Sequence, residues 1–274
     1  MRQAHIALLL VIVSFAGLPV GCDVPSGAGR GIADGGHAGA PTAADGARPV
    51  TSSTAAPVAP VSPRTVEERA LLRVVSKQAP LGAAYVPAEL VGLPEPAVSP
   101  GLGTLQLTRP ASEALLAMQV AARAAGLDVR VQSAYRSFEV QQQVHGALAA
   151  RLGEPEASRR SAPPGYSEHQ LGTVVDLTTA SVGWGLNARF AATAEGLWLA
   201  ANAPTFGFAL SYPEGAEAVT GYVYEPWHLR FIGSSRAAEW QRSGVTLVEY
   251  LGRVGGASPE PSLSAPLPRR GRGE

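Results

Sequence analysis

The sequence has little cysteine and no excess of charge of either sign. Its 274 residues contain one cysteine, and 22 basic side chains balance 22 acidic ones. A lone cysteine cannot form an internal disulfide, so the fold must be stabilised by its hydrophobic core. Because no net charge creates a strong field around the chain, we expect no nucleic-acid partner. The hydrophobic content of 46% is enough to bury one good core.

The apolar run near the amino end is too short to span a membrane. It reads IALLLVIVSFAGL, follows Arg2 and His5, and leads into LPVGC, which ends at Cys22. A spanning helix needs roughly 20 apolar residues. A shorter run behind a basic residue is typical of the core of a secretory signal peptide. We therefore predict that residues 1–22 are a signal peptide and that the protein is exported.

The residues before Cys22 resemble the processing box of bacterial lipoproteins. The small pair Val20-Gly21 directly precedes the cysteine, although Leu18 lies one place further from it than is usual. The resemblance implies lipidation of Cys22 and a membrane anchor that faces the periplasm or the cell wall. An ordinary signal peptide, cut near Gly21, is the alternative, and it also predicts export.

Two further segments lack periodic apolar residues. Residues 23–64 consist largely of Gly, Ala, Pro, Ser and Thr, which cannot repay the entropy of ordering, so we predict a flexible linker. Residues 255–274 are rich in Pro, Ser and Arg without a pattern, and we predict a disordered tail. One folded domain remains at residues 65–254, and we expect it to act as a monomer.

Periodicity within this domain predicts helices that come early and late and strands that dominate the middle. Helices are expected at 65–77, 109–126, 138–153, 187–203 and 246–254, with strands at 128–135, 172–177, 208–213 and 221–232. Thr65 and Thr246 each precede a glutamate by three residues, which predicts capping boxes, and Ser137 is a third expected cap. We therefore predict an α+β domain with a mainly antiparallel sheet flanked by helices.

The domain contains three histidines, of which two have acidic residues at short spacings. His169 lies seven residues before Asp176, and His228 lies three residues after Glu225. Two imidazoles and one carboxylate give zinc three protein ligands and leave a fourth position open, which is typical of a catalytic site. The third histidine, His145, is interpreted as an ordinary packing residue.

These spacings require the chain to bend. Residues seven or three apart point to opposite faces of an unbroken strand. We expect Gly172 to provide the turn between His169 and Asp176, and Pro226 to break the strand before His228. The alternative is that His169 caps a turn and Asp176 pairs with an arginine. Taken singly, each residue favours that alternative; taken together, they favour a metal site.

Three ordered motifs, SAYRS, PGYSEHQLGTVVDL and TGYVYEPWHLRFIG, closely resemble the VanY-type D-alanyl-D-alanine carboxypeptidases. That zinc peptidase family shares its fold with the D-alanyl-D-alanine dipeptidases and the hedgehog signalling domain. The resemblance covers roughly residues 74–233. It departs from the family pattern at Ala134, where glycine is usual, at Tyr166, and at Ser211, where arginine is common.

The resemblance implies a role for each matching residue. His169, Asp176 and His228 match the ligands of one zinc ion, and Glu225 matches the catalytic base. Arg136 matches the residue that grips the substrate carboxylate, which a guanidinium does with two parallel hydrogen bonds.

Several neighbours of these residues are interpreted from their positions. Gln132 and Ser133 are candidates to donate further bonds to the peptide. Glu168 is interpreted as structural, because its side chain would point away from that of His169 in an extended chain. Tyr212 and Trp227 are expected to be wall or core residues.

The expected function is therefore that of a zinc carboxypeptidase, with D,D- or L,D-specificity, that removes the terminal D-alanine from peptidoglycan stem peptides. Two alternatives are a peptidoglycan endopeptidase, which would not need a carboxylate grip, and a non-catalytic wall-binding or signalling module that keeps the metal. Arg136 argues against the first and Glu225 against the second.

Overall fold

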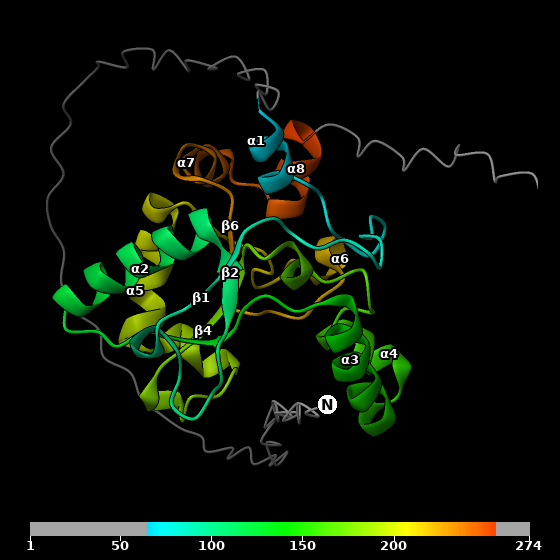
Figure 1. Cartoon of the computed structure of the whole chain (residues 1–274), viewed down its shortest axis with the longest axis horizontal. Coiled ribbons are helices and arrows are strands. Elements are labelled where there is room, and N and C mark those ends of the chain that lie inside the picture. The colour runs from blue at the N-terminus through cyan, green and yellow to red at the C-terminus, as the bar shows by residue number, and fades with distance from the viewer. Residues whose placement is uncertain (1–64, 256–274) are drawn as a thin grey trace, which may run out of the picture. The chain divides into compact units, whose positions relative to one another are not determined.

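A four-stranded antiparallel sheet runs through the part of the chain that the computed structural model describes, residues 65–255 (Figure 1). The strand order is β3–β4–β6–β5. The bounds are β3 Arg130–Ser133, β4 Val174–Thr178, β6 His228–Phe231 and β5 Phe208–Leu210. The predicted signal peptide with Cys22, the linker and nearly all of the tail lie outside the described residues.

The register of this sheet aligns three of the candidate site residues. Asp176 of β4 is the Cα partner of Ser133 in β3 and of His228 in β6. Directly opposed residues of paired strands project their side chains from the same face. One row across three strands therefore presents Ser133, Asp176 and His228 together.

The other elements are short strands and helices around this sheet. A separate antiparallel pair is formed by β1 Leu90–Gly92 and β2 Gln106–Thr108. The α-helices of the described residues are α1 Val66–Leu71, α2 Arg109–Ala124, α3 Phe138–Leu152, α4 Glu154–Arg160, α5 Ala194–Asn202, α6 Glu217–Thr220, α7 Ser234–Ser243 and α8 Leu247–Val254. The 3-10 segments are η1 Glu95–Ala97, η2 Glu168–Leu171, η3 Ala180–Val182, η4 Ala188–Ala192 and η5 Ala203–Phe206.

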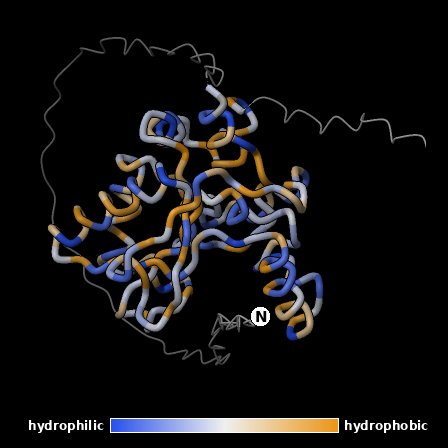
Figure 2. The backbone as a smooth tube through the Cα atoms, viewed as in Figure 1, coloured by the Kyte–Doolittle hydropathy of each residue, from blue (hydrophilic) through white to orange (hydrophobic). Residues whose placement is uncertain are grey.

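The main core lies between the sheet and α2. One face of α2 buries Ala111, Leu115, Met118 and Ala122, which recur at helical spacing. They belong to the same apolar cluster as the buried residues of the central strands, which Figure 2 shows as largely hydrophobic. Residues 174–178 of β4 are all buried, so this strand is covered on both faces. No helix of the described residues is both long and apolar enough to cross a membrane.

The structure confirms the α+β class and the antiparallel sheet. The predicted caps are also present: Ser137 accepts a hydrogen bond from the Val140 amide, and Thr246 with Glu249 forms a complete capping box. The Thr65 side chain accepts from the Glu68 amide at the start of α1.

Several predicted elements are shorter than expected; β5, for example, covers only the first half of the strand expected over 208–213. The helix expected over 65–77 ends at Leu71, because the carbonyls of Leu71 and Arg73 accept from Arg230 rather than from the next helical turn. The strand expected over 221–232 is limited to β6, because the chain turns at Pro226.

The helix expected over 187–203 is divided into η4 and α5. Thr193 accepts from the Gly196 amide and donates to the Phe190 carbonyl, so it caps a new helix instead of continuing the old one. Leu197, which lies seven residues after the fully buried Phe190, is 62% exposed as a result.

Candidate metal centre

Three separate segments bring His169, Asp176 and His228 together. Their ligand atoms all lie within 4.8 Å of one another, and each residue is only 4% exposed. The two imidazole rings meet edge to face, with centroids 5.0 Å apart. The structure thus places the three predicted ligands where one ion would contact all of them.

His169 is held by the short turn of η2. The Ser167 side chain accepts from the His169 amide, and Nδ1 of the ring lies 2.7 Å from the Ala134 carbonyl oxygen. Because a carbonyl only accepts, Nδ1 carries the proton, and Nε2 faces Asp176 Oδ2 at 3.2 Å with a free lone pair.

Gly172 provides the predicted turn between His169 and Asp176. Its φ of 69° lies in the left-handed region that favours glycine. A Cβ atom there would also lie 3.0 Å from side-chain atoms of Leu90 and Pro87. Both the backbone conformation and the crowding therefore require glycine at this position.

His228 follows the predicted break at Pro226. Its amide donates to the Glu225 carbonyl across the turn, at 3.1 Å. Nδ1 of the ring lies 3.2 Å from Asp176 Oδ1 and 3.4 Å from Glu225 Oε2, whereas Nε2 lies 3.1 Å from Glu168 Oε2. The turn therefore aims Nδ1 at the cluster and Nε2 away from it.

Asp176 offers the clearest sign that the cluster fits a cation. Its Oδ1 atom is buried and accepts no hydrogen bond, which is costly for a carboxylate oxygen. Burial alone would raise the pKa of Asp176, but the two adjacent imidazoles outweigh it and hold the pKa well below its usual range. A buried carboxylate that stays charged beside two imidazole nitrogens matches the ligand set of a zinc ion.

Glu225 lies beside the three candidate ligands but is not one of them. It is 9% exposed, and its amide donates to the Tyr212 carbonyl, which fixes the turn. Burial raises the pKa of Glu225, while His228 and Arg136 act in the opposite direction. A carboxylate with a raised pKa next to the cluster is suited to accept and return a proton.

Arg136 lies at the edge of the same group. Its backbone amide donates to the His169 carbonyl, and its guanidinium donates to Gln141 Oε1 at 2.7 Å and Ser133 Oγ at 3.0 Å. Burial lowers the pKa of Arg136, and the charges of Asp176 and Glu225 oppose that effect. The guanidinium is thus oriented before any ligand is present. Oε1 of Gln132, the neighbouring candidate, is buried without a hydrogen-bond partner.

The sequence interpretation missed the partner of Glu168. Residues 168–171 form a 3-10 turn rather than an extended chain, so Glu168 reaches His228 instead of pointing away from the site. Its other oxygen accepts from Nη1 of Arg230 at 2.7 Å, and the Arg230 side chain is completely buried. Burial would raise the pKa of Glu168, but Arg230 and His228 lower it to about 2. His228 and Arg230 are two residues apart on β6, a spacing that predicts a shared face.

The remaining expectations concern packing. The ring of Tyr212 lies 4.6 Å from that of His228, and Trp227 belongs to the main core cluster. His145 is buried and contacts the Ser161 carbonyl and Glu154, away from the candidate ligands.

Ser211 is buried beside a cavity of about 10 Å³ that Glu168 and Tyr222 also line.

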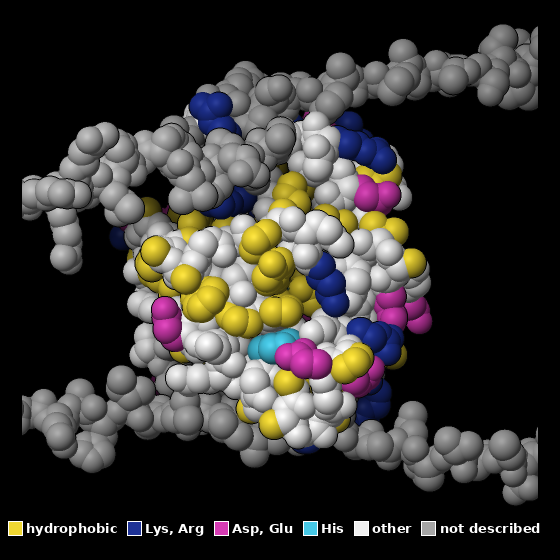
Figure 3. Space-filling view, turned by 90° about the vertical axis from the view of Figure 1, so that its right-hand side faces the viewer, with side chains coloured by type: hydrophobic (Ala, Val, Ile, Leu, Met, Phe, Trp, Pro, Cys, Tyr) yellow, Lys and Arg dark blue, Asp and Glu magenta, His cyan; other side chains and the backbone are white. Residues whose placement is uncertain are grey.

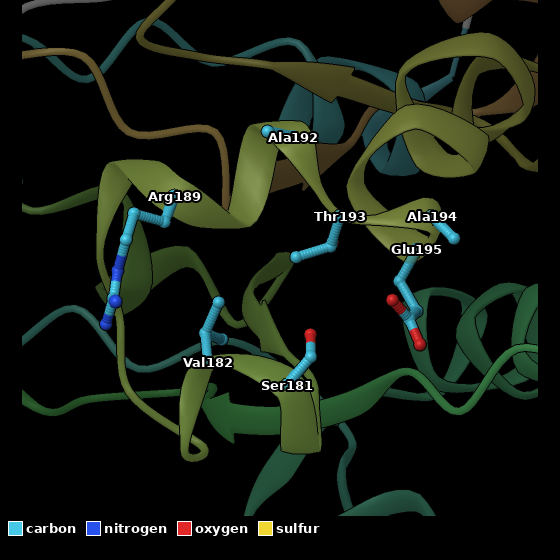
Figure 4. A pocket seen from close by; sticks show the side chains of 7 residues that line it. All are labelled: Ser181, Val182, Arg189, Ala192, Thr193, Ala194 and Glu195. Carbon is cyan, nitrogen blue, oxygen red and sulfur yellow. The ribbon is translucent and has the colours of Figure 1, made fainter.

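The surface offers a further hollow and an apolar face. A depression of about 400 Å³ lies between η3 and the start of α5, with Arg189 and Glu195 on opposite sides (Figure 4). None of the candidate site residues lines it.

Figure 3 views the side on which α3, α4 and α6 lie in Figure 1 and shows hydrophobic side chains gathered at its centre. Val140 of α3 and Val219 of α6 are both exposed.

Residues 104–234 match the family model described as VanY, D-alanyl-D-alanine carboxypeptidase. The match includes every candidate residue from Gln132 to His228. YodJ of Bacillus subtilis (strain 168) is 37% identical over 186 residues, which cover 67% of this chain and 68% of YodJ.

Solved structures show the same likeness. The LdcB LD-carboxypeptidase matches with a TM-score of 0.64 and 36% identity, covering 69% of this chain and 89% of the other. VanYB in complex with D-alanine-D-alanine matches with a TM-score of 0.57 and 31% identity, covering 66% and 97%. A mutant of the D,D-pentapeptidase VanY from the VanB-type resistance cassette, in complex with Zn(II), also matches with a TM-score of 0.57 and 31% identity. The match covers 66% of this chain and 99% of the other.

The geometry predicts that loss of one imidazole abolishes tight zinc binding. We expect the purified protein to retain zinc on gel filtration and His228→Ala to lose it, because two remaining ligands cannot hold the ion. His145→Ala is the matched control, since it removes a buried histidine outside the cluster. Metal analysis by mass spectrometry measures both. Full zinc retention by His228→Ala, with unchanged affinity, would contradict the assignment.

Proposed function

The chain belongs to the family of VanY-type D-alanyl-D-alanine carboxypeptidases, and on that premise we propose that it is a zinc-dependent enzyme that removes the C-terminal D-alanine from peptidoglycan stem peptides. The observation that carries this proposal is the meeting of three buried candidate ligands with Glu225 beside them and Arg136 at their edge. The Zn(II) complex of a relative and the D-alanine-D-alanine complex of VanYB support the choice of metal and substrate.

His169, Asp176 and His228 would hold the metal, and Glu225 would move the proton. When bound, zinc supplies a Lewis acid that polarises the scissile carbonyl and makes water more acidic. Glu225 takes the proton of the attacking water and returns it to the leaving amine. Its buried position beside His228 and its raised pKa suit a group that must change protonation state in each cycle.

Arg136 would recognise the free carboxylate of the terminal residue. Two guanidinium nitrogens already donate to Gln141 and Ser133, which fix the plane of the group before substrate arrives. A fixed guanidinium loses less entropy on binding than a mobile one, and it can still bind a carboxylate through its remaining donors. This grip is the feature that a carboxypeptidase needs and an endopeptidase does not.

Export and anchoring complete the proposal. The apolar run and the residues before Cys22 support a lipoprotein that is attached to the membrane and acts in the cell envelope. The substrate peptides belong to the cell wall, so an exported enzyme would meet them directly.

Product masses test the proposed reaction. The purified protein with zinc should shorten a stem pentapeptide, a stem tetrapeptide or both by one D-alanine, and a chelator should stop the reaction. The two substrates separate D,D- from L,D-specificity. Cleavage at an internal bond would instead support an endopeptidase, and intact peptides in the presence of bound zinc would contradict any peptidase role.

Glu225→Ala should bind zinc and substrate but turn over slowly. Removal of general acid–base assistance typically costs about 10²–10⁴-fold, and the loss should lie in kcat. Glu113→Ala, which removes an exposed carboxylate of α2, is the control. Steady-state kinetics with zinc content measured in parallel checks this. A kcat within twofold of the wild type would exclude Glu225 as the base.

Arg136→Ala should lose its preference for a free carboxylate. The contact is worth about 1.5–3 kcal/mol, and most of the loss should appear in KM. Amidation of the substrate should slow the wild type strongly and Arg136→Ala little, with Arg123→Ala, on the exposed face of α2, as control. An equal effect of amidation on wild type and Arg136→Ala would show that Arg136 does not bind the carboxylate.

A further inference from the structure

A buried ion pair lies behind His228, on the side away from the other candidate ligands. Nε2 of His228 is 3.1 Å from Glu168 Oε2, and the second oxygen of that carboxylate accepts from Nη1 of Arg230 at 2.7 Å. The side chains of Glu168 and His228 are each 5% exposed, and that of Arg230 is fully buried. The line of contacts therefore runs from the imidazole through the carboxylate to the guanidinium with very little exposure to bulk water.

Arg230 is fixed independently of Glu168. Its Nη2 atom donates to the carbonyl oxygens of Leu71 and Arg73, at 2.9 and 2.6 Å. These two carbonyls belong to the end of α1 and the segment after it, which lie outside the range matched by the family model. The guanidinium is thus held at a set position and presents one N–H to the carboxylate.

The buried ion pair of Glu168 and Arg230 is not explained by a gain in the stability of the fold. Burying two charges costs desolvation that their attraction repays only when all hydrogen bonds are made. Nε of Arg230 is buried without a partner. Well-packed apolar residues often serve stability as well as a buried ion pair does, so the position of the pair next to a candidate ligand points to another role.

That role follows from the tautomer of the imidazole. Guanidinium has only donors, so it requires an acceptor at Oε1, and a carboxylate offers a second acceptor at Oε2. An acceptor at Oε2 requires the proton of His228 to sit on Nε2, which leaves the lone pair of neutral His228 on Nδ1. Nδ1 is the nitrogen that faces Asp176 and Glu225.

We propose that Glu168 and Arg230 are positioning residues that fix His228 with its Nδ1 lone pair directed at the metal. The proposal rests on the proposed function, because it assumes that His228 is a ligand. Glu168 acts through His228, and Arg230 acts through Glu168 by forbidding the opposite orientation of hydrogen bonds. Partners behind a metal-binding histidine typically change metal affinity by about 10–100-fold when they are removed.

Glu168→Gln tests the direction of the hydrogen bonds with little change in volume. An amide has one acceptor and one donor end, and Arg230 must take the oxygen. The amide NH₂ group then faces Nε2, which moves the imidazole proton to Nδ1 and blocks the ligand position. We expect zinc affinity, measured by competition with a chromophoric chelator, to fall by about 10–100-fold. Circular dichroism and thermal unfolding of the metal-free protein should still show a folded chain.

A double variant and a matched control separate positioning from stability. In Glu168→Gln/Arg230→Met the amide can turn its oxygen toward Nε2, so we expect zinc affinity to recover relative to Glu168→Gln. Glu239→Gln is the control, because Glu239 also accepts from an arginine, Arg236, and from Tyr250, on α7 away from the candidate ligands. It should leave zinc affinity unchanged.

The outcomes are distinct. Zinc affinity of Glu168→Gln equal to that of the wild type overturns the proposal while the wild type still binds zinc. If Glu168→Gln does not fold, the double variant decides: folded protein with affinity near the wild type supports positioning, and folded protein that binds more than about 100-fold more weakly overturns it. A wild type that binds no zinc overturns the proposed function itself.

Discussion

Three buried carboxylates surround His228, and the charge that they bring must be balanced. Asp176 and Glu225 approach one ring nitrogen, and Glu168 approaches the other. Buried charges are stable only when they are paired or bind a metal. Arg230 balances Glu168, and Arg136 lies close enough to Asp176 and Glu225 to influence both. Oδ1 of Asp176 still has no hydrogen-bond partner, and a cation bound there would give that oxygen a partner.

The sheet and two turns place these charges. The register of β3, β4 and β6 sets Ser133, Asp176 and His228 in one row. Gly172 turns the chain so that His169 meets Asp176, and Pro226 stops the ladder so that Glu225 meets His228. The same site therefore depends on long-range strand pairing for Asp176 and on local backbone geometry for the two histidines. The position of Arg136 depends on both strand pairing and local geometry, since it follows β3 and precedes the Ser137 cap of α3.

The sequence predicted the parts of this arrangement that have a local signal. The spacing of His169, Asp176, Glu225 and His228, the turn residues and the helix caps are all read from short stretches. The bond between Glu168 and Arg230 joins residues that are 62 apart, and it depends on η2, which has no periodic pattern. The end of α1 could not be predicted either, because it depends on carbonyls that accept from the distant Arg230. The break at Thr193 was missed because it depends on a side-chain cap, and the apolar pattern continues across it.

The site described above requires zinc to lie among His169, Asp176 and His228, with Glu225 outside the set of ligands. A crystal structure of the zinc-loaded protein tests it most directly. We expect an ion about 2.0–2.1 Å from Nε2 of His169 and Nδ1 of His228 and about 2.0–2.2 Å from Asp176, with Glu168 still bonded to Nε2 of His228. An ion held by Glu168 or bound directly by Glu225, or a His228 ring turned to present Nε2 to the metal, would contradict this arrangement of ligands.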